Sequence, residues 1–293
     1  MRSDLLIVLL LFAGLAGGTV SLHAECRLEP GPQRTVTRAL DGQTLALDDG
    51  SVVRLAGALA PLAYDAADNA WPPAANATAA LAALAVGRTV VLGYTGSGRR
   101  DRQNHHVAQV FVIDGGEEIW LQGRMLSDGH ARAYQRKDQR GCAAELLAHE
   151  HVARNAGRGL WSVGAYLPRA AARTRDLEGM NGRFAVLAGR IAWVAEGRET
   201  IALGFTPQRT RGWSLRRGIT VMIENRDRDL LGSLGGDPKA LLGRDVEVRG
   251  WLEQRLGRPA GTFVMDISLA GLIVDRSAET PAPPNTAPRL PRP

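Results

Sequence analysis

The sequence lacks an apolar run long enough to cross a membrane. Its longest run, Leu5–Ala16, is followed by Gly17-Gly18 and His23, so it ends before the roughly 20 residues that a spanning helix needs. A short region of small residues then ends at Ala24, which is typical of a cleaved secretory signal peptide. We therefore expect an exported protein of bacterial type, periplasmic or secreted, with no stable membrane span after cleavage. An uncleaved anchor is the alternative.

Cysteine is nearly absent, because the chain has only Cys26 and Cys142. Neither residue lies in a recognisable nucleophile motif, so we do not expect a catalytic cysteine. Glu25 stands before Cys26 where a lipidated cysteine needs a small residue, so we do not expect a lipoprotein. An even pair of cysteines in an exported protein usually forms a disulfide. We expect a Cys26–Cys142 bridge, and two separate thiols are the alternative.

The chain also lacks a strongly basic folded region, although its net charge is +6. Residues 25–166 hold equal numbers of basic and acidic side chains, and residues 176–275 differ by one. The excess comes mainly from residues 167–175, with Arg169, Arg173 and Arg175, and from the C-terminal tail. A basic chain usually indicates nucleic acid or an anionic surface as partner, and this distribution weakens that indication.

The hydrophobic pattern predicts a mainly β protein with some helices. Apolar residues alternate through Thr44–Leu47 and Val52–Leu55 around a turn at Asp48-Asp49-Gly50, which predicts a hairpin. Helical spacing and Gly stops predict helices at Ala74–Ala85, Ile119–Ser127 and Ala143–Asn155. Further strands are expected at Thr89–Tyr94, His106–Ile113, Arg183–Val194, Thr200–Phe205, Ile219–Ile223, Asp245–Glu253 and Thr262–Ser268, and a short helix at Pro238–Leu242.

These elements divide the chain into two folded regions, as its length also suggests. Five strands and one short helix in the second region predict a small OB-like β-barrel. The expected segments are a signal peptide at 1–24, an OB-type barrel domain with packed helices at 25–166, a linker at 167–180, the second barrel at 181–275 and a disordered Pro-rich tail at 276–293.

Residues 34–163 resemble the staphylococcal-nuclease-like (thermonuclease) family. The matching segments follow the family's order: VTRALDGQTLALDDGSVVRLAG at Val36–Gly57, the bend at Ala60-Pro61, DRQNHHVAQVFV at Asp101–Val112, LQGRMLSDGHARAY at Leu121–Tyr134 and LLAHEHVARNAGRGLW at Leu146–Trp161. The resemblance implies a five-stranded OB-type barrel that carries a calcium-dependent nuclease. In such a site a calcium ion sits on oxygen ligands, a glutamate activates water, and two arginines clamp the phosphate.

The resemblance also implies that most of the catalytic side chains are missing. Gln43 stands where the family has an aspartate. Leu59 and Leu62 stand before and after the proline of the bend, at the two positions where the family has acidic residues. His105 replaces the second arginine, and Arg54 is the retained catalytic position. Arg54 then either contacts a phosphate or forms a surface ion pair. Asp41 is expected to cap the Asp-Gly turn rather than bind a metal.

We therefore expect a catalytically inactive nuclease homologue that acts as a binding or structural module, with nucleic acid as one candidate ligand. No cofactor and no metal site are expected, except calcium if the family's activity persists. One alternative is a metal-dependent nuclease with an altered site. Another is an envelope module that binds an oligosaccharide or polysaccharide, as OB barrels also do. The sequence indicates no oligomeric state.

The second region offers two further groups of candidate binding residues. Arg209, Arg211, Arg216 and Arg217 form a basic loop that either meets phosphate or is simply solvated. Aromatic side chains here either stack on bases or belong to the core, and they are Phe205, Trp213, Trp251 and Phe263.

Overall fold

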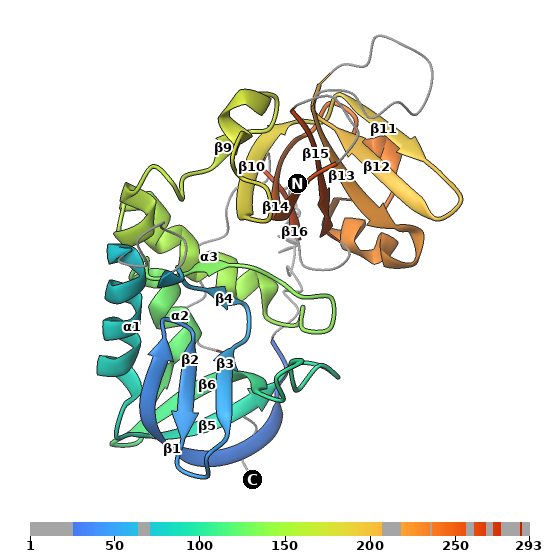
Figure 1. Cartoon of the computed structure of the whole chain (residues 1–293). Coiled ribbons are helices and arrows are strands. Elements are labelled where there is room, and N and C mark those ends of the chain that lie inside the picture. The colour runs from blue at the N-terminus through green and yellow to red at the C-terminus, as the bar shows by residue number, and fades with distance from the viewer. Residues whose placement is uncertain are drawn as a thin grey trace, which may run out of the picture.

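The structure is a computed structural model of the whole chain, and it describes residues 26–63, 71–206, 218–234, 236–255, 261–267, 272–276 and Pro288 (Figure 1). The expected signal peptide lies outside the described residues, and so does nearly all of the expected Pro-rich tail. The basic loop with Arg209, Arg211, Arg216 and Arg217 lies outside them as well.

The N-terminal part is built on a closed ring of five strands. The strands are β1 (Glu29–Asp41), β2 (Thr44–Leu47), β3 (Val52–Leu55), β5 (Thr89–Tyr94) and β6 (His106–Asp114). Neighbours follow the order β3-β2-β1-β5-β6, and a parallel pairing of β3 with β6 closes the ring. Alternation puts Leu45, Val53 and Leu92 into the interior, where they are fully buried. The expected OB-like barrel is therefore confirmed.

Three helices and three short strands surround this ring in the described N-terminal residues. Helices α1 (Pro72–Ala85) and α3 (Ala143–Asn155) match the predicted segments within two residues. Helix α2 (Leu121–Ser127) begins later than predicted, because Ile119 pairs with Val112 in β7 (Glu117–Trp120). Strands β4 (Ala58–Leu59) and β8 (Arg132–Ala133) form a separate two-stranded pairing that leads toward α3.

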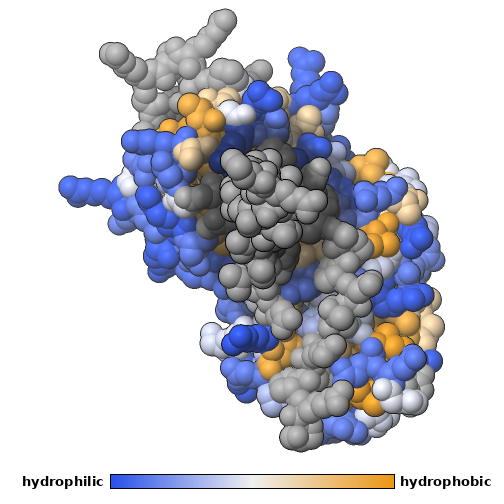
Figure 2. All heavy atoms as spheres, turned by 180° about the vertical axis from the view of Figure 1, so that it is seen from behind, coloured by the Kyte–Doolittle hydropathy of each residue, from blue (hydrophilic) through white to orange (hydrophobic). Residues whose placement is uncertain are grey.

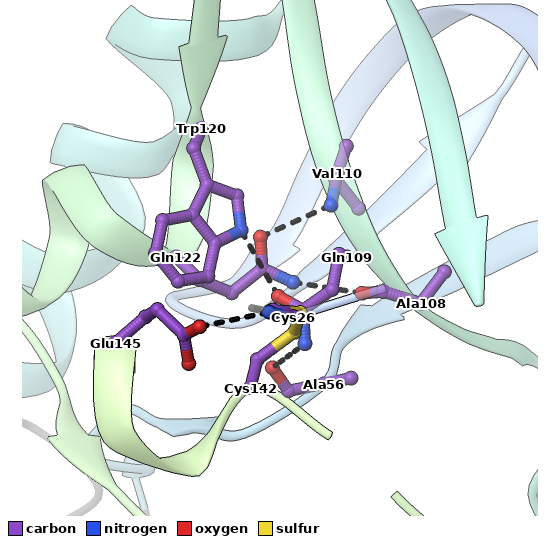
Figure 3. The surroundings of a disulfide bond; sticks show 9 residues. All are labelled: Cys26, Ala56, Ala108, Gln109, Val110, Trp120, Gln122, Cys142 and Glu145. Carbon is purple, nitrogen blue, oxygen red and sulfur yellow. Dashed lines mark hydrogen bonds between the residues drawn. A yellow bond between two sulfur atoms is a disulfide. The ribbon is translucent and has the colours of Figure 1, made fainter. Parts of the chain in front are cut away.

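The predicted disulfide between Cys26 and Cys142 is present, with Cα atoms 4.7 Å apart. It ties the segment before β1 to the start of α3 (Figure 3). The backbone N–H of Cys26 also donates to Glu145 Oε1 at 2.9 Å. Near the bridge, the buried Gln122 side chain accepts the backbone N–H of Val110 and donates to the backbone oxygen of Ala108, both on β6 (Figure 3). A disulfide of this kind is typical of oxidising compartments.

The C-terminal part is an open mixed sheet and not the small barrel that the sequence predicts. Its strands are β9 (Arg169–Ala170), β10 (Phe184–Arg190), β11 (Trp193–Glu196), β12 (Thr200–Gly204), β13 (Gly218–Glu224), β14 (Asp245–Gln254), β15 (Thr262–Asp266) and β16 (Leu272–Asp275). Their order is β11-β12-β13-β15-β14-β10-β9, and β16 pairs with β14. Within the described residues, the path does not return on itself, because its end strands β9 and β11 do not pair with each other.

Two local differences from the sequence prediction explain this outcome. The expected strand Arg183–Val194 is two strands, since the chain leaves β10 after Arg190 and starts β11 at Trp193. The expected linker at 167–180 carries β9, which pairs in parallel with β10, and the 3-10 helix η3 (Thr174–Leu177). Ala171 and Leu177 are fully buried in the C-terminal core, so this segment packs with the sheet.

The remaining short helices are 3-10 helices. They are η2 (Gly159–Ser162) after α3, and η4 (Asn225–Leu234) and η5 (Pro238–Leu241) between β13 and β14. No helix of the described residues is both long and apolar enough to cross a membrane. The face seen from behind shows mainly hydrophilic described residues, with hydrophobic ones scattered between them (Figure 2).

A buried cluster of four charged side chains joins the two parts. Arg249 on β14 is 1% exposed, and its guanidinium contacts Glu150 on α3 at 2.6 Å and Glu247 at 2.6 Å. Its Nη1 also donates to the backbone oxygen of Ala133 on β8 at 3.1 Å. Arg154 of α3 donates through both Nη atoms to Glu247. Arg249, Glu150 and Glu247 are thus removed from water together and Arg154 partly so, and each keeps an opposite partner.

This cluster predicts a specific acid sensitivity. Burial alone would raise the pKa of Glu247, but the attraction of Arg249 and Arg154 lowers it to about 2 from 4.5. Because the folded-state pKa is depressed, the stabilisation is complete above the unfolded pKa and is lost as pH falls from about 4.5 to about 2. We expect the free energy of unfolding to fall by on the order of 3 kcal/mol over that range through this group.

Urea denaturation at a series of pH values measures this effect. Glu247→Gln should be less stable at neutral pH and show a flatter decline below pH 4.5 than the wild type. Asp245→Asn on the same strand is the matched control, because Asp245 is 47% exposed and pairs with exposed Arg190. Equal slopes for Glu247→Gln and the wild type would show that this carboxylate does not link stability to pH.

Candidate functional site

The turn between β1 and β2 is fixed by side chains that point back at the backbone. Asp41 Oδ1 accepts the backbone N–H of Gln43 at 2.8 Å, so Asp41 caps the turn as expected. Gln43 is 5% exposed, and its Oε1 accepts the backbone N–H of Ala60 at 3.1 Å. This contact fastens the first hairpin to the segment that follows β4. The Gln43 oxygen therefore has a structural partner inside the protein.

Leu59 lies at the boundary between the barrel and the C-terminal sheet. It pairs with Arg132 across β4 and β8 and is 8% exposed. Its side chain belongs to a small apolar cluster with Phe184 and Val186 of β10, against which Tyr134 packs. The residue that follows the bend, Leu62, is partly buried. The bend thus contributes apolar contacts to the boundary and no charge.

A tight loop before β6 is organised around the carboxylate of Asp101. Asp101 Oδ1 accepts the backbone N–H groups of Gln103 at 2.9 Å and His105 at 3.0 Å. The backbone of Asp101 also exchanges hydrogen bonds with His105 O and Asn104 N. Asn104 has φ of +64°, a left-handed conformation that asparagine tolerates better than most residues. The local sequence therefore fixes the position of His105 relative to Asp101.

The second oxygen of Asp101 brings the side chains of an arginine and a histidine together. His105 Nδ1 lies 3.3 Å from Asp101 Oδ2, and Arg54 Nη2 lies 3.9 Å from the same atom. The Asp101 side chain is 5% exposed, whereas Arg54 is 36% and His105 29% exposed. An arginine and a histidine, each about one third exposed, thus flank one buried carboxylate. Arg54 Nε, Asp101 Oδ2 and His105 Nδ1 are all buried without a hydrogen-bonding partner of good geometry within the described residues.

Tyr134 is the aromatic neighbour of this group. Burial raises the pKa of its phenol, while the charges of Arg136 and Arg54 act in the opposite direction, and Asp101 also contributes. The phenol therefore lies within electrostatic reach of Arg54 and Asp101. On its other side, the ring meets Phe184 edge-on with centroids 6.2 Å apart. Tyr134 thus packs against the C-terminal sheet and interacts electrostatically with Arg54 and Asp101.

The structure brings together only some of the residues that the sequence singled out. Arg54 and His105 meet at Asp101, a residue whose importance the sequence analysis missed although it starts the DRQNH run. The available signal in the sequence was an aspartate followed four residues later by a histidine. Among the candidate stacking residues, Phe205 and Phe263 are buried in the core and Trp251 is 40% exposed, while Trp213 lies outside the described residues.

The calcium ion implied by the resemblance does not fit the residues at its expected place. Calcium prefers several oxygen ligands, some of them charged. Gln43 offers one neutral oxygen that already accepts from Ala60 N, and Leu59 offers none because it packs against Phe184. Within the described residues, no three side chains of His, Cys, Asp or Glu converge as a metal site would require.

The comparisons with known proteins agree with the geometry of the barrel. Residues 52–163 match the family model described as Staphylococcal nuclease homologue, which spans β3 through η2. Members of that family are calcium-dependent nucleases. No curated protein matches the chain. The match includes β3, β5, β6 and the three helices, whereas β1 and β2 precede it. Residues 52–163 of the chain are thus similar to staphylococcal nuclease homologues, and we name the barrel with its helices the nuclease homologue domain after this similarity.

Proposed function

We propose that the nuclease homologue domain binds the phosphate backbone of single-stranded nucleic acid and does not hydrolyse it by the family's calcium mechanism. The observation that carries the proposal is the grouping of Arg54 and His105 on either side of buried Asp101. The carboxylate holds the two side chains in place and leaves their outer edges half exposed. A phosphate oxygen approaching from solvent can meet both of them.

The chemistry of the two groups favours a phosphate over a neutral ligand. An arginine presents several N–H donors in a planar fork that matches phosphate oxygens, and a protonated histidine adds a second charge-assisted donor. One buried carboxylate offsets one of these charges, so the group carries a net positive charge when His105 is protonated. Oligosaccharide binding would instead use uncharged donors and acceptors, and the position of Arg54 beside His105 offers no specific advantage for it.

The same geometry argues against the family's hydrolytic step. The position of the water-activating glutamate is Leu62, and loss of a general base alone reduces rates by roughly 10²–10⁴. The side-chain oxygen of Gln43 already accepts the backbone N–H of Ala60, and the side chain of Leu59 packs against Phe184. Binding without turnover is thus the function that these side chains support best. A nuclease with an altered metal site is an outcome that the measurements below would reveal.

Replacing Arg54 tests the proposal directly. We expect Arg54→Ala to weaken the binding of a fluorescent oligo(dT) by about tenfold at low salt, since charge-assisted hydrogen bonds contribute about 1.5–3 kcal/mol. The slope of log affinity against log salt should also shrink by about one, because one phosphate contact is lost. Fluorescence anisotropy at several salt concentrations measures both quantities.

Arg124→Ala is the matched control, because Arg124 lies on α2 and pairs with Asp128 at an exposed site. It should leave affinity and slope unchanged. Affinity that is independent of salt, or equal effects of the two substitutions, would contradict a phosphate site at Arg54. Shortened oligonucleotide in the wild-type reaction would instead identify an active nuclease.

The role of His105 predicts a gain of affinity. A histidine is fully charged only when protonated, whereas an arginine is charged at every pH at which proteins are folded. His105→Arg should therefore tighten oligo(dT) binding at about pH 8, by an amount on the order of a few-fold, and His105→Gln should not. The same anisotropy titration measures this effect. If His105→Arg binds no better than the wild type at that pH, then His105 does not contact the phosphate.

A further inference from the structure

Trp251 is the only exposed aromatic side chain in the described part of the chain, at 40%. It lies on β14, two residues after Arg249, so both side chains point to the same face of the strand. Arg249 is the residue that contacts Glu150 on α3. Trp251 therefore lies on the face of the C-terminal sheet that meets the nuclease homologue domain, at a point where this face is open to solvent.

The indole of Trp251 is held by a series of aromatic contacts. It meets Phe184 edge-on, with centroids 5.7 Å apart and planes at 74°, and the two residues are direct partners across β10 and β14. Phe184 is 5% exposed and in turn meets Tyr134 edge-on. The guanidinium of Arg132 lies 5.0 Å from the centre of the Phe184 ring. The contact with Phe184 limits the motion of the Trp251 indole, which lowers the entropic cost of binding.

We propose that Trp251 is a base-stacking position, and that a single strand whose phosphate is held by Arg54 and His105 continues across the domain boundary onto the C-terminal sheet. This inference rests on the proposed function. Its physical basis is continuity, because Tyr134 packs beside Leu59 on the nuclease side and beside Phe184 on the sheet side. The ring centroids of Tyr134 and Phe184 are 6.2 Å apart, and those of Phe184 and Trp251 are 5.7 Å apart, so Phe184 connects Tyr134 to Trp251.

The surroundings of Trp251 favour a base over a protein partner. Exposed polar residues lie around it along both strands: Arg183, Glu253, Gln254 and Arg255. A protein-binding surface is usually a contiguous apolar patch, and a lone aromatic ring among polar groups does not provide one. A nucleic-acid base needs only one such ring, since stacking on an aromatic side chain is worth about 1–3 kcal/mol and tolerates any base.

Length-dependent binding separates this inference from the proposed function. The probes are a thymidine dinucleotide and an oligo(dT) of about twelve nucleotides, the scale of one single-strand site. Trp251→Ala should weaken the oligomer about tenfold, as expected for the loss of one stacked base, and leave the dinucleotide unchanged. Arg54→Ala should weaken both. Trp251→Phe keeps an aromatic face and should stay within about twofold of the wild type, whereas Trp251→Leu should behave like Trp251→Ala.

Each outcome of this experiment decides one of the two statements. Unchanged oligomer binding in Trp251→Ala, together with weaker binding in Arg54→Ala, would overturn the stacking position and keep the phosphate site. Wild-type affinity in Trp251→Leu would overturn stacking as the interaction, because an apolar contact alone would then be sufficient. Equal loss for both probes in folded Trp251→Ala would also overturn the inference. Trp193→Ala, at the far end of the sheet on β11, is the control for a general effect of removing a tryptophan, and thermal melting confirms that each variant is folded.

Discussion

The arrangement of this protein depends on the buried contact between Arg249 and Glu150. A guanidinium with 1% exposure needs opposite charge close by, and Glu150 and Glu247 provide it from opposite sides of the boundary. Arg154 then balances Glu247. Because these groups are stable in the interior only when they are together, the C-terminal sheet is held against α3 and β8 in one position. The placement of every residue at the boundary follows from that constraint.

The residues at the family's expected calcium position suit this boundary. Phe184 and Val186 pack against Leu59 of β4, so an apolar residue at position 59 is buried there without the cost of removing a charge from water. Gln43 suits the same situation, since its neutral oxygen accepts the N–H of Ala60 without the cost of burying a charge. Farther from the boundary, Asp101 keeps a carboxylate that positions Arg54 and His105. Apolar and neutral side chains thus lie where the C-terminal sheet meets the barrel, and the charged group around Asp101 is the part of the domain for which we propose anion binding.

Local features of this fold could be predicted from the sequence, and contacts between distant segments could not. Alternation and turn residues identified β2, β3 and β5, and the bounds of α3 follow from its helical spacing and its Gly stops. The barrel came from the resemblance of its ordered segments. The open C-terminal sheet was missed because strand spacing gives no information on whether end strands pair, and because β9, with two residues, is too short to recognise. The grouping at Asp101 was missed since it joins β3 to a loop 47 residues later, at the parallel pairing of β3 with β6.

The central claim is that this domain binds nucleic acid through fixed cationic side chains and without a calcium ion. The most direct measurement is the affinity of the full-length protein for labelled oligo(dT), taken once with calcium and once with a chelator, with the oligonucleotide length checked after each titration. The account predicts the same affinity in both conditions and intact oligonucleotide throughout. Binding or cleavage that appears with calcium and is lost with the chelator would contradict it, because a metal site would then exist where Gln43 and Leu59 offer none.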